Sequence, residues 1–213
     1  MPKEAEKIWT DVDRYFVETL HLSDPILDST MKANAAAELP AIDVAPNQGK
    51  LLHLLAKLVS AKRILEIGTL GGYSTIWLAR ALPPNGRLIS LEFSAKHAEV
   101  AKSNVQRADL SERVEIRVGA ALDSLPSIEK EGIAPFDFIF IDADHRYPSV
   151  KADWENYSPM IAPGGIFAFH DTQHIGDDSY GVEQLWNEIT SEGDVRWMHS
   201  VMTNHCGIGL LWL

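Results

Sequence analysis

Two aspartates at the ends of apolar runs are the residues best suited to chemistry in this sequence. Asp142 follows the run Phe138–Ile141, and Asp171 closely follows the run Ile166–Phe169. If these runs are neighbouring parallel strands, their carboxyl ends lie about 5 Å apart at one edge of a sheet. Two carboxylates there repel each other unless a cation or a proton lies between them. Because hard dications prefer oxygen ligands, we predict that both aspartates bind Mg²⁺ or another divalent cation. The alternative is that one of them caps a following helix or turn.

Histidines accompany both aspartates. His145 follows Asp142 by three residues, and a reference pKa near 6.5 suits a base that deprotonates a hydroxyl group at neutral pH. A surface or capping histidine is the other interpretation of His145. We interpret His170 as a buried, hydrogen-bonded residue, or as a metal ligand together with Thr172 or water. Asp144 is interpreted as a helix or turn cap.

A glycine-rich turn marks a second candidate site. The apolar run 63–67 leads into the turn Gly68–Gly72, and a predicted helix begins at Tyr73. Glycines in such a strand–turn–helix unit let the backbone approach a ligand, and the helix start offers free N–H groups. A second predicted strand ends in Glu92, 24 residues after Gly68, where Rossmann-like sites bind ribose hydroxyls.

The spacing of these glycines argues against a dinucleotide ligand. The turn departs from the GxGxxG pattern, so Thr69 and Leu70 occupy the path that a pyrophosphate would take. Glu66, just before the turn, would attract a cationic ligand end and repel phosphate. We therefore expect a nucleoside ligand without a pyrophosphate; the alternative is a turn that binds no ligand.

Alternating strands and helices are expected to position these residues. Strands are predicted near 63–67, 87–92, 113–118, 136–142 and 164–170, and helices near 73–82, 94–108, 120–130 and 148–160. Pro83–Gly86 and Ala162–Gly165 are predicted turns. The last two strands are continuous apolar runs, which is typical of parallel strands covered on both faces.

Further elements flank this alternation. Three helices are predicted at the N-terminal end: one at 4–21, a second that starts at Pro25, and a third that follows Pro46 and ends near Ser60. Near the C-terminal end, a helix at 179–192 precedes strands near 194–202 and 206–213. The predicted fold is α/β: a Rossmann-like, doubly wound, mostly parallel seven-stranded sheet with an antiparallel C-terminal strand and helices on both faces. We expect a single domain over 1–213, in which 1–60 forms a cap or an interface and 61–213 forms the core.

Composition limits the classes of partner. The chain has 30 acidic and 19 basic residues and a net charge of −11, which argues against a nucleic-acid or anionic-membrane partner. The single cysteine, Cys206, excludes an internal disulfide. With no apolar run of membrane-spanning length, we expect a cytoplasmic protein.

The motifs together resemble the class I S-adenosylmethionine-dependent O-methyltransferases of the caffeoyl-CoA and catechol family. The matching segments are Ile64–Thr75, Leu88–Glu92, Arg117–Leu122 and Phe138–Asp144. The resemblance implies that S-adenosylmethionine is the cofactor, with Glu92 at the ribose, Ala120 near the adenine and Val44–Gly49 as a lid over the methionine end. The implied cofactor-binding residues are Val44, Glu66, Gly68, Tyr73, Ser74, Glu92, Gly119, Ala120 and Asp142.

The second half departs from that family pattern. His145 stands where the family has a lysine, and Asp171–Thr172 stands where it has an Asp–Asn pair. The run Ile141–Tyr147 and the segment Phe169–Asp171 also resemble a group that includes macrolide-sugar O-methyltransferases and cephalosporin-hydroxylase-like proteins. Members of that group hold a divalent metal in an aspartate cluster, and some have a histidine base.

The sequence therefore predicts a methyltransferase that acts on a hydroxyl group of a small molecule. The predicted catalytic residues are His145 and Asp142, and the predicted metal ligands are Asp142, Asp171 and Thr172. The polar loop that contains His174 is a candidate cover for the acceptor, and the N-terminal helices are a candidate homodimer interface. Two alternatives stay open: a non-catalytic S-adenosylmethionine-binding protein, and an NAD-dependent oxidoreductase on a similar sheet.

Overall fold

Helices and strands alternate along the chain in the computed structural model, which describes residues 3–20, 22–173, 180–191, 196–203 and 206–213. The helices are α1 (Lys3–Thr19), α2 (Pro25–Ala36), α3 (Pro46–Leu58), α4 (Tyr73–Ala79), α5 (Ala95–Arg107), η1 (Ala121–Ser124), α6 (Leu125–Glu131), α7 (Tyr147–Tyr157), η2 (Ser158–Met160) and α8 (Val182–Ser191). The strands are β1 (Arg63–Ile67), β2 (Arg87–Glu92), β3 (Val114–Val118), β4 (Phe136–Ile141), β5 (Ile161–Phe169), β6 (Arg196–Thr203) and β7 (Cys206–Trp212). Within the described ranges, no helix is long and apolar enough to cross a membrane.

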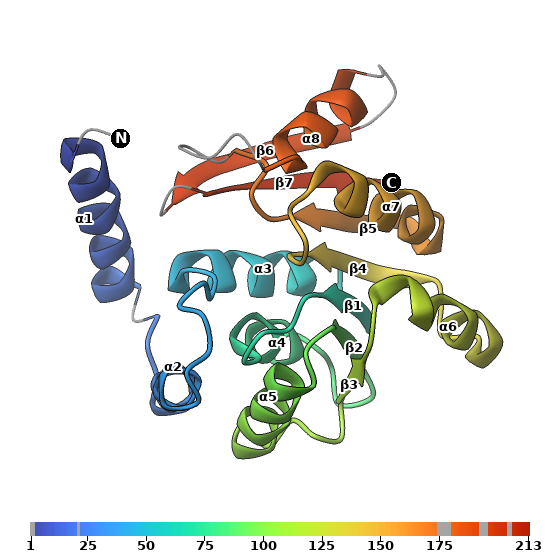
Figure 1. Cartoon of the computed structure of the whole chain (residues 1–213), viewed down its shortest axis with the longest axis horizontal. Coiled ribbons are helices and arrows are strands. Elements are labelled where there is room, and N and C mark those ends of the chain that lie inside the picture. Colours follow the sequence, from blue (N-terminus) through green and yellow to red (C-terminus); the bar gives the residue numbers. More distant parts are fainter. Residues whose placement is uncertain (1–2, 21, 174–179, 192–195, 204–205) are drawn as a thin grey trace.

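The strands form one seven-stranded sheet in the order β3-β2-β1-β4-β5-β7-β6 (Figure 1). β1 to β5 pair in parallel, whereas β7 pairs antiparallel with both β5 and β6. This confirms the predicted sheet with its antiparallel C-terminal strand. Ile67 pairs with Ile141, and Ile141 pairs with Phe169, so the ends of β1, β4 and β5 are level with one another.

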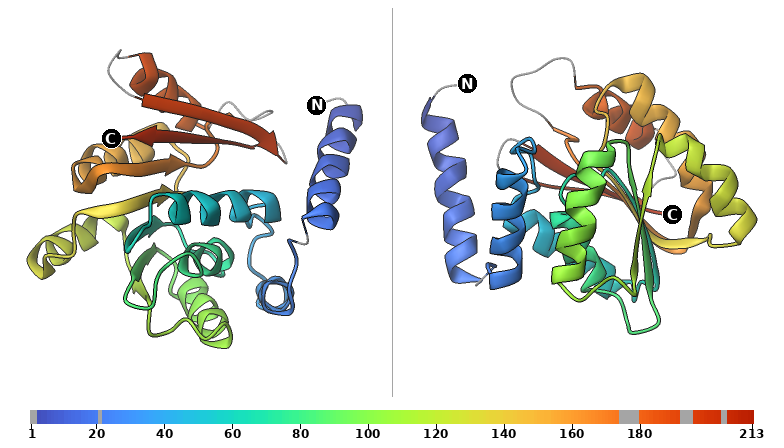
Figure 2. Two further views of the ribbon diagram at one scale, coloured as in Figure 1. Left: turned by 180° about the vertical axis from the view of Figure 1, so that it is seen from behind. Right: turned by 60° about the horizontal axis from the view of Figure 1, so that its bottom comes forward.

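Helices cover both faces of the sheet, as predicted (Figure 2). One core cluster joins α3, α4 and α5 to one face and contains Phe138 and Phe140 of β4. The other joins α6, α7 and α8 to the opposite face and contains Ile139 and Ile141. Successive β4 side chains point to opposite faces, and both faces are buried, which explains why the run is apolar at every position.

α1 and α2 lie outside the two layers of helices that cover the sheet (Figure 2). Asp24 caps α2 by accepting hydrogen bonds from the N–H groups of Ile26 and Leu27, and Pro25 opens the helix as predicted. α2 packs against α4 and α5, whereas α1 contacts α3 and β6. In Figure 1, α1 lies at the left-hand side, beyond the carboxyl ends of the parallel strands.

Two predicted boundaries differ from the structure. The predicted helix 120–130 is a 3₁₀ turn followed by α6, with Pro126 in the first turn of α6, where its missing N–H costs little. The predicted turn Ala162–Gly165 lies inside β5, which begins at Ile161 and pairs with β4 across an irregularity near Phe136. The residues of the predicted turn are therefore part of β5, at the irregular end of its pairing with β4.

Candidate active site

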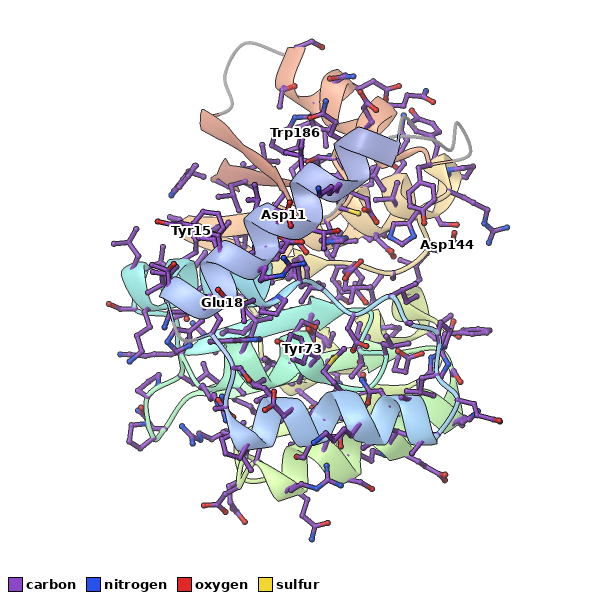
Figure 3. The ribbon with its side chains drawn as sticks, turned by 90° about the vertical axis from the view of Figure 1, so that its left-hand side faces the viewer. Asp11, Tyr15, Glu18, Tyr73, Asp144 and Trp186 are labelled. Atoms are coloured by element: carbon purple, nitrogen blue, oxygen red, sulfur yellow. The ribbon has the colours of Figure 1, made fainter. Side chains whose placement is uncertain are left out.

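Two adjoining cavities lie at the carboxyl edge of the parallel strands, where α/β sheets bind ligands. The first, named here the cluster cavity, has a volume of about 360 Å³. The second, named the Glu92 groove, has a volume of about 800 Å³. Both are lined by Ile42, Gly68, Leu70, Asp142 and Ala143, so the two cavities share a wall. Figure 3 shows the molecule from the side of α1 and α2, with Tyr73 labelled between these helices and Asp144 at the right.

Gly68 brings the glycine turn against the end of β4. Its φ is +97°, and a Cβ atom placed there would lie 1.9 Å from the carbonyl oxygen of Asp142. The N–H of Gly68 donates to Leu91, and the N–H of Asp142 donates to Ile67. Only glycine permits this conformation and this approach together, which explains how the turn and Asp142 line the same cavities.

Glu92 fixes the same turn from the side of β2. Its Oε2 accepts hydrogen bonds from the N–H groups of Thr69 at 3.1 Å and Leu70 at 2.8 Å. Its Oε1 accepts from the N–H of Ser94 and lies 3.3 Å from Nδ1 of His97. Glu92 is buried to 7% exposure and lines the groove, so the carboxylate that the sequence places at a ribose also orders the backbone beside it.

Glu66 lies beneath the turn rather than in a cavity. Its carboxylate accepts hydrogen bonds from the hydroxyl groups of Ser74, Thr75 and Ser90, and the residue is fully buried. Burial raises its pKa to about 7, although these hydroxyls favour the charged form. Glu66 lines neither cavity, so the structure differs from the expectation that it meets a cationic ligand end directly.

Four side chains converge in the cluster cavity: Asp142, His145, His170 and Asp171. They follow β4 and β5, whose ends are level, and one ligand atom from each lies within 4.8 Å of the others. His145 Nε2 is 2.7 Å from Asp171 Oδ2 and 3.5 Å from Asp142 Oδ1. His170 Nδ1 is 3.2 Å from Asp171 Oδ2 and 3.3 Å from Asp142 Oδ1. The sequence predicts the two aspartates here, with His145 as a base and His170 as a possible ligand, and the structure brings all four side chains together.

The four members of this cluster shift one another's pKa values. Burial opposes charge on every member, yet the carboxylates raise the pKa of His145 and His170, and the histidines hold the pKa of Asp142 and Asp171 low. Nε2 of His145 and Nδ1 of His170 are buried without a hydrogen bond, despite their short distances to carboxylate oxygens. Nitrogen and oxygen atoms thus face a common point, an arrangement that fits a metal ion.

Most of the other predicted site residues line the cavities. Val44, Tyr73 and Ser74 line the cluster cavity, and Gly119 and Ala120 line the groove. The roles expected for them stay predictions.

The remaining predicted residues have different outcomes. Thr172 is 1% exposed and lines neither cavity; its N–H donates to the carbonyl oxygen of Gly207. Asp144 accepts from the backbone N–H of Arg146 and the hydroxyl of Ser149, which is the capping role expected for it. His174 lies outside the described residues.

Sequence reasoning did not single out Tyr180 or Asp43 of the cluster cavity, and it included Gln48 only as part of the predicted lid Val44–Gly49. Tyr180 stacks on His145 with ring centroids 4.7 Å apart, and Asp43 accepts a hydrogen bond from Asn34. Gln48 accepts from the N–H of Ala45 and contacts His170 at 3.3 Å. A glutamine at the third position of α3 is a helix-start signal, but its contact with His170 spans 122 positions and has no sequence signature.

Comparison with known proteins identifies the family. A family model described as "O-methyltransferase" matches residues 18–183. The chain belongs to the O-methyltransferase family. This confirms the resemblance seen in the sequence, and the α/β fold is that of solved O-methyltransferases.

Individual O-methyltransferases resemble the chain over different extents. It is 56% identical over 138 residues to a catechol O-methyltransferase of Niastella koreensis and 51% over 144 residues to one of Mycobacterium tuberculosis. These matches cover 65% and 68% of this chain but only 62% and 64% of the relatives' own lengths. A solved O-methyltransferase of Bacillus cereus in complex with SAH is 41% identical, with a TM-score of 0.86 over 98% of this chain and 100% of that one. TomG of Streptomyces achromogenes, involved in tomaymycin synthesis and solved with SAM, is 37% identical, with a TM-score of 0.84 over 98% of both chains.

Proposed function

We propose that the protein transfers the methyl group of S-adenosylmethionine to a hydroxyl oxygen of a small molecule. The observation that carries the proposal is the shared wall of the two cavities at Gly68, Leu70 and Asp142. A nucleoside that occupies the Glu92 groove would extend its other end past this wall toward the Asp/His cluster. Two solved relatives are complexes with SAH or SAM, which supports the same ligand here.

The chain would hold this cofactor through its backbone and a few side chains. Glu92 would accept hydrogen bonds from the ribose hydroxyls, and Ala120 and Leu122 would contact the adenine in the groove. Tyr73 and Ser74 at the start of α4 would border the methionine end in the cluster cavity. The buried Glu66 would act from beneath by ordering Ser74 rather than by touching the ligand.

The reaction is an in-line displacement in which the acceptor oxygen forms a bond to the methyl carbon as the sulfur–methyl bond breaks. S-adenosylhomocysteine leaves, and the hydroxyl proton must be lost. Asp142 and His145 would position the acceptor hydroxyl beside the methyl group, which supplies rate by orientation. The carboxylates raise the pKa of His145 to about 9 against the opposing effect of burial, so without a metal this residue is protonated at neutral pH and is a poor base.

A divalent cation fits the cluster, because two buried nitrogens there make no hydrogen bond and face two carboxylates. Asp142 and Asp171 would hold it, as the sequence predicts; Thr172 is not placed at the cavity. When bound, such a cation would lower the pKa of an adjacent hydroxyl group. The proton could then pass to water without a dedicated base.

Catechols are the first acceptors to test, because the two curated relatives carry that name. A screen of catechols, simple phenols and sugars with S-adenosylmethionine, with and without EDTA, would measure methylated product by mass spectrometry. We expect product with a catechol and a loss of rate with EDTA. S-adenosylhomocysteine binding without any product would instead support a non-catalytic binding protein, and NAD binding alone would support an oxidoreductase.

We further propose that residues 1–213 form one domain in which 1–60 forms a cap or an interface, and that the protein is cytoplasmic and forms a homodimer. Exposed apolar residues in α1 and directly after it support the homodimer: Ile8, Tyr15 and Leu20 are each more than half exposed. Figure 3 labels Tyr15 at the left-hand edge of α1. Sedimentation of the wild-type protein and of a Tyr15→Glu variant would measure this association.

A further inference from the structure

The cluster cavity contains two histidine nitrogens besides its two aspartates, and this ligand set suits a different class of metal ion from aspartates alone. Aspartates alone favour hard cations such as Mg²⁺, which bind oxygen ligands. Here His145 Nε2 and His170 Nδ1 lie 2.7 Å and 3.2 Å from the same Asp171 oxygen. Imidazole nitrogen suits Zn²⁺, Co²⁺, Ni²⁺ and Cu²⁺ better than Mg²⁺ or Ca²⁺.

The protonation of His170 can be worked out from its neighbours. The N–H of Ala45 donates to the side-chain oxygen of Gln48, which identifies that atom as an acceptor. The same oxygen lies 3.3 Å from Nε2 of His170, so Nε2 must carry the hydrogen and donate. A neutral His170 therefore directs the lone pair of Nδ1 at the carboxylates of Asp142 and Asp171. This is repulsive unless a proton on Nδ1 or a metal ion lies between them.

This arrangement of His170 is the one that metal-binding histidines adopt. A ligand histidine usually donates its other N–H to an oxygen, which fixes the tautomer and the ring orientation. Gln48 provides that oxygen, and the ring of His170 also packs edge-on against Phe140. His170 is only 7% exposed, and its Nδ1 makes no hydrogen bond.

His145 is the fourth member of the set. Its Nε2 is buried without a hydrogen bond and lies near Asp142 and Asp171. Its ring is stacked on Tyr180, which restrains its orientation. One ligand atom from each of the four residues lies within 4.8 Å of the others, the proximity that ligands of one metal ion need.

We propose that Asp142, His145, His170 and Asp171 bind a transition-metal dication of the Zn²⁺ or Co²⁺ class in preference to Mg²⁺ or Ca²⁺. This inference deepens the metal part of the proposed function. Two carboxylates balance the charge of the ion, and two neutral imidazoles complete the set. His145 is then a ligand, and Nε2 is not free to act as the base.

Metal titration of the EDTA-dialysed full-length protein tests the inference. Calorimetry with Zn²⁺, Co²⁺ and Mg²⁺ should show tighter binding of the first two. The visible absorption of bound Co²⁺ should change in His145→Ala and His170→Ala, whereas His53→Ala, a histidine outside the cluster, should leave it unchanged. Gln48→Ala should weaken Co²⁺ binding roughly 10–100-fold, because the residue orients a ligand. Mg²⁺ binding as tight as that of Zn²⁺ and Co²⁺ in the wild-type protein, or unchanged Co²⁺ spectra in both cluster variants, would overturn it.

Calorimetry with S-adenosylhomocysteine on the same metal-free protein separates this inference from the proposed function. The Glu92 groove does not include the histidines of the cluster, so the cofactor product should bind without metal. If S-adenosylhomocysteine binds but Zn²⁺ and Co²⁺ do not, the metal inference is wrong and the proposed function stands. If the metals bind and S-adenosylhomocysteine does not, the proposed function is wrong and the metal site stands.

Discussion

Glu66 shows how one buried residue links the glycine turn to the stability of the protein. Three hydroxyl groups bind its carboxylate beneath the turn, and no solvent reaches it. A carboxylate in such a place costs folding free energy whenever it is ionised. The sequence marks Glu66 as notable because a charge interrupts an apolar strand, but it does not show whether that charge faces a ligand or the interior.

We predict a pH-dependent stability that arises from Glu66. Burial raises its pKa in the folded protein from 4.5 to about 7, so the folded state binds the proton more tightly than the unfolded state. The free energy of unfolding should fall as pH rises from about 4.5 to about 7, by about 3 kcal/mol in total from this group. Glu66→Gln should remove this slope, whereas Glu99→Gln, at an exposed position of α5, should retain it. Denaturant unfolding across this range measures the effect, and equal slopes for wild type and Glu66→Gln would contradict it.

At the scale of elements, the glycine turn and the end of β4 form one unit. The turn can lie against Asp142 only because Gly68 has no side chain. Gly132, at the end of α6, also has a positive φ, +63°, but a Cβ atom there would have nothing within 4 Å. These two glycines therefore separate the cost of the backbone conformation from the cost of the close contact.

We predict that Gly68→Ala is the more damaging of the two substitutions. Gly132→Ala should cost about 1–2 kcal/mol, the usual penalty of a left-handed conformation for a residue with a Cβ atom. Gly68→Ala adds a backbone clash at 1.9 Å and should lower the free energy of unfolding further, with weaker cofactor binding. Urea unfolding of both variants makes the comparison. Equal destabilisation would show that the turn can move away from β4 without cost.

The elements themselves could be predicted because each leaves a local signal. Continuous apolar runs identified β4 and β5, and Asp24–Pro25 marked the start of α2. The interior of β5 was obscured because its pairing across a bulge is not a local property. Contacts between distant segments, such as that of Gln48 with His170, were likewise beyond reach. The proximity of Asp142 and Asp171 could be predicted, because alternating strands and helices indicate neighbouring parallel strands whose ends meet at one sheet edge. The orientation of the histidine rings could not, because it depends on long-range packing.

For the whole molecule, the central claim is that one ligand spans the Glu92 groove and the cluster cavity. The level ends of β1, β4 and β5 place these cavities side by side, and Glu92 is the charged residue that joins the groove to the turn. Removal of the Glu92 carboxylate should weaken binding of the nucleoside end of the ligand, while the positions of the four cluster side chains should not change.

The most direct test is calorimetric titration of the wild-type protein, Glu92→Ala and Glu99→Ala with S-adenosylhomocysteine and NAD. We predict that S-adenosylhomocysteine binds to wild type and to Glu99→Ala with equal affinity and that NAD does not bind. Glu92→Ala should weaken binding by about 1.5–3 kcal/mol, roughly 10- to 150-fold, since hydrogen bonds to a charged group are lost. Binding of NAD without S-adenosylhomocysteine, or full affinity in Glu92→Ala, would contradict the account.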